Sequence, residues 1–203
     1  MTAPPPAAAE LDDAVRAACQ RGAPGEGSAM ILRALGREIG AYLGSIVRSG
    51  ADDVAETFSM WCEDLVRGLP GFRFGASVRT WAYTLARHAA VRRARGDRRR
   101  GRRLELPGEL ADLAAAARTA TVEYLRTQVK DRLAEVRASL SDEERELLYL
   151  RVDRQLPWRE IARILAQDEA ALEAAALQRR EQALRKRFET LKRRLKDRLA
   201  NGS

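Results

Sequence analysis

Cysteine and histidine are almost absent from this sequence of 203 residues. Its two cysteines, Cys19 and Cys62, lie far apart, and His88 is its one histidine. Zinc sites need several cysteines or histidines at short spacings, and a catalytic triad needs a histidine as its base. No motif for phosphate cradling or nucleophile activation stands in their place. We therefore expect no metal, no cofactor and no enzymatic activity.

Long apolar runs are also lacking. No stretch approaches the length of a membrane-spanning helix, and residues 1–10 lack the basic start and apolar segment of a signal peptide. We expect a cytoplasmic protein without membrane insertion. Aromatic residues make up only 5% of the chain, whereas the helix formers Ala, Leu, Arg and Glu dominate it, so the predicted fold is all-α.

Basic residues are what the chain has in excess. The 37 lysines and arginines outnumber the 29 acidic residues, which gives a net charge of +8. Nine arginines and a single acid, Asp97, occur between Arg87 and Arg103. A balance of this kind predicts an acidic partner such as nucleic acid.

Hydrophobic periodicity divides the chain into two small helical domains joined by a linker. Residues 1–28 are predicted to form a tail with one short helix. Residues 29–95 form the first domain, in which three helices bury complementary apolar stripes. Glycine, proline and charge, followed by an Ala-rich run, predict a linker over residues 96–121. Residues 122–203 are the expected second domain.

The first domain has recognisable inward and outward faces. The residues expected to face inward are Ile31, Leu35, Ile39, Tyr42, Leu43, Ile46, Val47, Val54, Phe58, Trp61 and Leu65, with Leu69 as a further candidate. The acidic residues expected on an exposed face are Asp52, Asp53, Glu56, Glu63 and Asp64. We expect this acidic face and the basic face of the following helix to be different surfaces, and Ser77 to cap that following helix.

The stretch 72–103 combines arginines with aromatic residues on one predicted helix and the loop before it. A run of arginines neutralises phosphates by counterion release, and flat side chains can stack on unpaired bases. The aromatic candidates are Phe72, Phe74, Trp81 and Tyr83. The alternative is an ordinary amphipathic helix with Trp81 in the core.

The second domain has the order of a helix-turn-helix. A capping box of Ser141 and Glu144 starts one helix, and Pro157 suits the first turn of the next. The C-terminal segment 184–199 is apolar along one edge and basic along the other. Such a helix suits a reader of the DNA major groove, and it also suits a solvated or self-associating helix; the order of the preceding helices favours the reader.

Four stretches resemble motifs of the extracytoplasmic-function group of bacterial RNA polymerase sigma factors. DDVAETF at 52–58 is similar to the family's DLVQETF, and FRFGASVRTWAYTLARH at 72–88 is similar to FRGxxSFRTWLYRIARN. LPWREIARIL at 156–165 is similar to LSYEEIAEIL, and LRKRFETLK at 184–192 is similar to VKSRLHRAR.

The resemblance implies a sigma factor, which directs core RNA polymerase to promoter DNA and assists its melting for transcription initiation. It also implies an anti-sigma factor as a partner. The residues assigned to core polymerase are Asp52, Asp53, Glu56 and Phe58. Those assigned to the minus-ten element and its melting are Phe72, Arg73, Arg79, Trp81, Tyr83, Arg87, His88, Arg92 and Arg93. Those assigned to the minus-thirty-five element are Trp158, Arg185, Lys186, Arg187, Glu189, Lys192 and Arg193.

The start of the recognition helix is open to three interpretations. The family has a short Gly-containing turn where residues 166–183 contain neither Gly nor Pro. If Asp168 caps the recognition helix, residues 173–176 would face the DNA. If 166–183 is an insertion, which we prefer, residues 184–192 would do so. A single long helix over 168–199 would instead suggest a partner-binding arm.

Two rival functions belong to other classes. A stand-alone helix-turn-helix regulator would need no polymerase-docking surface, so the acidic helix at 52–58 favours the sigma factor. A scaffold of amphipathic helices would bind its partners with little dependence on salt, whereas phosphate binding weakens steeply as salt rises.

Overall fold

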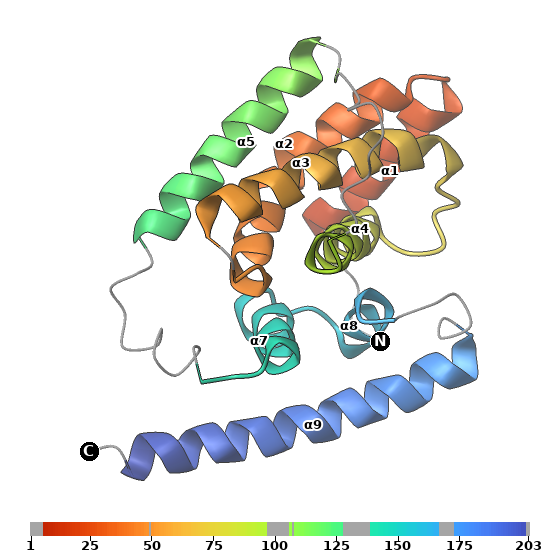
Figure 1. Cartoon of the computed structure of the whole chain (residues 1–203). Helices are drawn as coiled ribbons and strands as arrows, with labels where there is room; N and C mark the ends of the chain where they lie inside the picture. The colour runs from red at the N-terminus through yellow and green to blue at the C-terminus, as the bar shows by residue number, and fades with distance from the viewer. Residues whose placement is uncertain are drawn as a thin grey trace. The chain divides into compact units, whose positions relative to one another are not determined.

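The computed structural model describes residues 6–48, 50–96, 106, 108–127, 139–166 and 173–201, and the regular elements within these ranges are all helical (Figure 1). The prediction of an all-α fold is confirmed for this part of the chain. Two compact units divide the chain, Met1–Thr127 and Gln128–Ser203. Some residues singled out above lie outside the described ranges: the arginines within 98–103, and Asp168.

The first unit is built around α2 (Pro24–Ile46). Four helices pack on it: α1 (Pro6–Gln20), α3 (Ala51–Gly68), α4 (Val78–Ala94) and α5 (Gly108–Thr127). The inward stripes predicted for α2 and α3 are confirmed for most of their length, since Tyr42, Phe58 and Trp61 are fully buried. At the end of α2 the prediction fails, because Ile46 and Val47 are only half-buried. The Trp61 indole Nε1–H donates to the carbonyl of Ala82 at 3.0 Å, which joins α3 to α4.

The N-terminal segment is a larger part of this unit than the sequence indicated. The predicted short helix is present as α1, which begins at Pro6 and contacts both α2 and α4. Val15 and Ala18 of α1 are fully buried, so this helix contributes to the core of the unit. The connection to α2 is short, because Gly22 turns the chain with a φ of 76° and Pro24 already begins α2.

The expected linker over 96–121 is wrong for its second half. Residues from Gly108 onward form α5, which packs along α2 and α3 and continues to Thr127. Its buried face consists of Leu110, Ala114 and Ala117, which recur at helical spacing. Small side chains suit this site because a Cβ atom at Gly36 of α2 would lie only 3.1 Å from the Cβ of Ala117. The small side chains of this segment therefore allow close helix packing, and they do not mark a linker.

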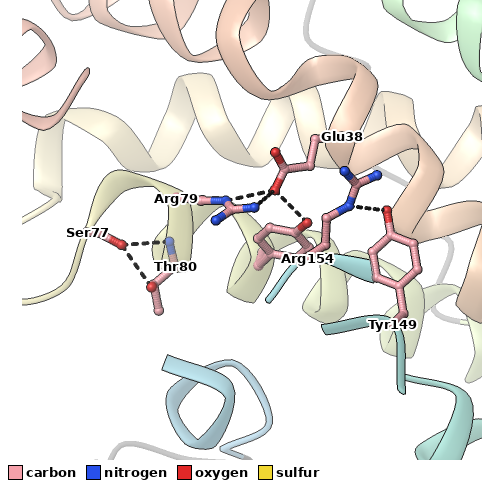
Figure 2. A network of polar contacts seen from close by, with 7 residues as sticks. Glu38, Ser77, Arg79, Thr80, Tyr149 and Arg154 are labelled. Carbon is pink, nitrogen blue, oxygen red and sulfur yellow. Dashed lines mark hydrogen bonds and ion pairs between the residues drawn. The ribbon is translucent and has the colours of Figure 1, made fainter. Parts of the chain in front are cut away.

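The second unit consists of α7 (Asp142–Leu148), a π-helical turn (Tyr149–Asp153), α8 (Trp158–Ile164) and α9 (Ala174–Asn201). The predicted capping box of Ser141 and Glu144 is confirmed, and Pro157 is the N-cap of α8. Arg154 closes the π-helical turn by donating from Nε to the Tyr149 hydroxyl at 2.8 Å (Figure 2). None of the helices described in either unit is long and apolar enough to cross a membrane.

α9 is one uninterrupted helix of 28 residues (Figure 1). Residues 174–183, which we preferred to interpret as part of an insertion before the recognition helix, are its first turns. The absence of Gly and Pro, together with Ala, Gln, Glu and Arg, explains this continuity. Over its described residues α9 matches most closely the third interpretation, a single long helix.

Candidate nucleic-acid interface

Three aromatic rings gather where the loop before α4 meets that helix. The rings of Phe72 and Trp81 are stacked, with centroids 4.5 Å apart and an interplanar angle of 18°. Phe74 lies against Phe72 at 4.6 Å with a tilt of 47°. All three side chains are half-buried, so the cluster is part of the surface. We call Phe72, Phe74 and Trp81 the aromatic cluster.

The loop that carries this cluster is fixed at the N-terminus of α4. The Ser77 hydroxyl accepts the backbone N–H of Thr80 at 3.1 Å, which confirms the predicted cap (Figure 2). A second cap comes from α1, where the Asp12 carboxylate accepts the N–H of Val78 at 2.8 Å. Burial raises the pKa of Asp12, and this effect exceeds the lowering by its hydrogen bond. Two of the N–H groups that a helix leaves unsatisfied are therefore paired.

Tyr83 and Arg79 do not belong to the exposed part of this surface. Tyr83 is fully buried, and its hydroxyl donates to Oε1 of Glu38 on α2 at 2.7 Å. Arg79 pairs with the same carboxylate at 2.6 Å (Figure 2). The assignment of Tyr83 to nucleic acid is therefore corrected, because its ring is in the core against Tyr42 at 4.9 Å. Through its contacts with Tyr83 and Arg79, Glu38 holds α4 on α2.

We expected the acidic and basic faces of the first unit to be separate surfaces. In the structure they adjoin. Arg93 at the end of α4 pairs with Asp53 and Glu56 of α3, and Arg92 pairs with Asp64. Because α3 and α4 pack side by side, their charged rows meet along the seam. Of the acidic residues of α3, Asp52 is exposed, whereas Asp53, Glu56 and Asp64 are half-buried.

The remaining residues of the predicted surface differ in exposure. Arg73 and His88 are exposed, and Arg87 is half-buried. Desolvation lowers the pKa of His88, and the nearby guanidinium groups of Arg87 and Arg92 lower it further. Both effects favour the neutral form of its imidazole. Of the residues assigned to polymerase contact, Phe58 is fully buried and the assignment to direct contact is corrected.

α9 separates into an inward apolar face and an outward polar face. Leu177, Leu184, Phe188 and Leu191 are buried. At 3.6 residues per turn, the residues opposite this stripe are exposed and mostly polar. They include Arg179, Gln182, Lys186, Thr190 and Arg193, which we call the outward face of α9.

Four further basic residues of α9 form ion pairs within the second unit. Arg187 pairs with Glu143 at 2.5 Å and Arg194 with Glu144 at 2.7 Å, which ties α9 to the N-terminus of α7. Hydrogen bonding to Arg194 is the main reason that the pKa of Glu144 lies below its usual value. Arg185 pairs with Glu181 and Lys192 with Glu189 along the helix itself.

Trp158 lies between α8 and α9 instead of on an open surface. Its ring meets Phe188 edge to face with centroids 5.4 Å apart, and the guanidinium carbon of Arg151 lies 4.9 Å from its centroid. The side chain is half-buried. Its contacts make Trp158 a residue that supports α9.

Sequence reasoning missed three residues on these surfaces. Arg179 and Gln182 continue the outward face of α9, and the helical periodicity of residues 174–183 was the signal for them. Arg16 of α1 lies over the ring of Phe74, with its guanidinium carbon 4.9 Å from the centroid. No sequence signal links these two residues, because only the fold brings α1 to the loop before α4.

The described residues contain no group of three or more His, Cys, Asp or Glu side chains arranged to hold a metal ion. Comparison of the chain with family models, with curated proteins and with solved structures found no match.

Proposed function

We propose that this protein is a sigma factor that brings core RNA polymerase to promoter DNA and helps to open the strands. The observation that carries the proposal is the aromatic cluster, formed by the stretch 72–88 that most resembles the family. Phe72, on a loop that two caps hold in place, and Trp81 of α4 present a stacked, half-exposed pair of rings. A fixed aromatic surface next to arginines suits unpaired bases, which stack on flat side chains without regard to their hydrogen-bonding edges.

The second unit supports the proposal through charge and exposure. In this account α8 and α9 are the two helices of a helix-turn-helix, and α9 enters the major groove. A single long helix also suits the partner-binding arm considered above, but the basic outward face of α9 favours DNA as its ligand. Its outward face carries long polar side chains, Arg179, Gln182, Lys186 and Arg193, that reach base edges and phosphates. Of the residues assigned to the minus-thirty-five element, Lys186 is the proposed contact to base edges. Arg193 is the corresponding phosphate contact.

A specific observation favours one alternative, a stand-alone DNA-binding regulator. Two of the acidic residues assigned to polymerase contact, Asp53 and Glu56, already pair with Arg93 inside the unit. A regulator that never meets polymerase would keep them in this way. If the protein is a sigma factor, the polymerase contact consists of the exposed Asp52 together with the outward-facing parts of Asp53 and Glu56.

Competition for core polymerase separates the two functions. Purified bacterial core polymerase and this protein are mixed and run on a size-exclusion column, with and without an excess of a primary sigma factor. A sigma factor co-elutes with core in equal amounts and is displaced by its competitor, because one docking surface serves both. Elution at its own volume in every run, together with salt-sensitive binding to duplex DNA, would support the regulator.

Asp52 offers a variant for the same experiment. Asp52→Arg reverses an exposed charge in the first turn of α3, and Asp112→Arg is a matched control because Asp112 is an exposed acid of α5. We expect Asp52→Arg to weaken binding to core at least fivefold and Asp112→Arg to leave it within twofold, magnitudes typical of single interfacial charges.

A further inference from the structure

Arg16 extends the aromatic cluster by a cation. Trp81 stacks on Phe72, Phe72 contacts Phe74, and the guanidinium of Arg16 lies over Phe74 at 4.9 Å from its centroid. Four flat groups from α1, the loop and α4 therefore follow one another across the surface. Arg16 is an exposed residue, so its side chain is within reach of a ligand.

The position of Arg16 is set by a rigid part of the fold. Asp12, one turn earlier on α1, holds the N–H of Val78 at 2.8 Å. Val15 and Ala18, which flank Arg16 on the same helix, are fully buried. Asp12 also attracts Arg16 electrostatically, while Oδ1 of its carboxylate accepts from the backbone of α4. α1 thus presents Arg16 to the loop at a fixed place.

A guanidinium over an aromatic face has two uses toward a nucleic acid strand. Its plane continues the stacking series, and its N–H groups donate to phosphate oxygens. A single strand that lays successive bases on aromatic side chains carries its phosphates along the edge of the same surface. An arginine at the end of the series meets a phosphate there.

We propose that Arg16 is a DNA-binding residue that holds a phosphate of single-stranded DNA whose bases stack on the aromatic cluster. The inference rests on the proposed function for the class of its ligand, and it assigns to α1 a role in contacting the opened strand. It predicts that the strand crosses from α4 over the loop to α1.

Photo-cross-linking of the full chain tests this role. The probe is a single-stranded oligonucleotide of about 12 nucleotides with 5-iodouracil at defined places, a length that matches common single-strand site sizes. Mass spectrometry then identifies the cross-linked residues. We expect cross-links at Phe72, Phe74 or Trp81. Arg16→Gln should lower their yield roughly fivefold, as expected for the loss of a cation next to stacked rings.

Arg21 provides the matched control. It follows the same helix, carries the same charge and pairs with Glu26 at 3.2 Å. Arg21→Gln should leave the yield at the aromatic cluster within twofold of the parent chain. Arg16→Lys should give an intermediate yield because it keeps the charge and loses the plane, and it carries the test if Arg16→Gln lowers the melting temperature.

Equal yields at the cluster for the Arg16 and Arg21 variants, or cross-links only in the second unit, would overturn the inference. Failure of the proposed function has a different signature. If the chain does not bind core polymerase but Arg16→Gln still lowers the yield at the cluster, the sigma-factor proposal is wrong and the role of Arg16 stands.

Discussion

Trp81 and Tyr83 are two residues apart on α4, and the sequence suggested the same role for both. The structure separates them, because Tyr83 is fully buried and donates to Glu38, while Trp81 remains at the surface in the aromatic cluster. A difference of two positions on a helix is a rotation of more than half a turn. Which of the two faced the core depended on where Glu38 of α2 lies, and no local pattern gives that position.

The Tyr83 hydroxyl makes a prediction about stability. Tyr83→Phe should lower the free energy of unfolding of the first unit by about 1–3 kcal/mol, because it leaves a half-buried carboxylate with one donor fewer. Urea denaturation followed by circular dichroism measures the loss. In a double-mutant cycle with Glu38→Gln, the two losses should not add, and strict additivity would show that the hydroxyl and the carboxylate do not interact.

The two cysteines should differ sharply in reactivity. Cys62 is fully buried, and burial raises its pKa to about 12; Cys19 is half-exposed, with a pKa that desolvation also raises. A thiol reacts as its thiolate, so at pH 8 Cys19 should react slowly with a thiol reagent and faster as the pH rises. Cys62 should react only when urea unfolds the chain. Rapid labelling of a Cys19→Ser variant without urea would contradict the burial of Cys62.

The positions of most helices could be predicted from the sequence, but which helices pack against each other could not. The stripes of α2 and α3, the cap at Ser77 and the capping box at Ser141 are local signals, and the structure confirms them. α5 was missed because we treated an Ala-rich run with little bulk as a linker. Its partner is a glycine, and the fit of Ala117 against Gly36 appears only when the two helices are in place.

A larger side chain at Gly36 should therefore displace α5. Gly36→Leu brings new atoms against Ala117, and overpacking of this kind costs about 1–3 kcal/mol. Hydrogen exchange should show α5 amides losing roughly tenfold or more of their protection, while α3 and α4 keep theirs. Ala34→Leu is the control, because Ala34 is an exposed residue of the same helix. Unchanged protection of α5 in Gly36→Leu would mean that α5 is not held by this contact.

The two faces of α9 make opposite predictions. Lys186→Ala with Arg193→Ala removes two charges from the outward face, and Arg187→Ala with Arg194→Ala removes two that pair with α7. In anisotropy titrations with duplex DNA, the first pair should lower the slope of log affinity against log salt by about 2. The second pair should change that slope less and should destabilise the second unit instead.

Acid denaturation adds a check on the inward pair. Because the pKa of Glu144 is depressed in the folded chain, its contribution to stability is present above its usual pKa and is lost as the pH falls through the lowered value. Removing Arg194 should therefore make the second unit less stable near neutral pH and flatten its loss of stability below about pH 5.

For the DNA titrations, equal slopes of log affinity against log salt in both pairs of variants would show that DNA prefers neither face of α9.

At the scale of the whole molecule, composition predicted the all-α fold class, which the described part of the chain confirms, and it suggested an acidic partner, while motifs suggested the function. The excess of base is distributed unevenly: α9 carries Arg and Lys along most of its length, whereas the arginines at the end of α4 are largely occupied by α3. That distribution was out of reach of the sequence, because ion pairs between α3 and α4 depend on packing. The arginines at the end of α4 therefore offer less free charge to DNA than their number suggests.

Run-off transcription tests the central claim most directly. Bacterial core polymerase is incubated with this protein and a library of genomic fragments, and the starts of the transcripts are sequenced. The account predicts starts that share two upstream motifs at a fixed spacing and disappear when the protein is left out. Transcript starts that are the same with and without the protein, or none at specific places, would contradict the assignment as a sigma factor.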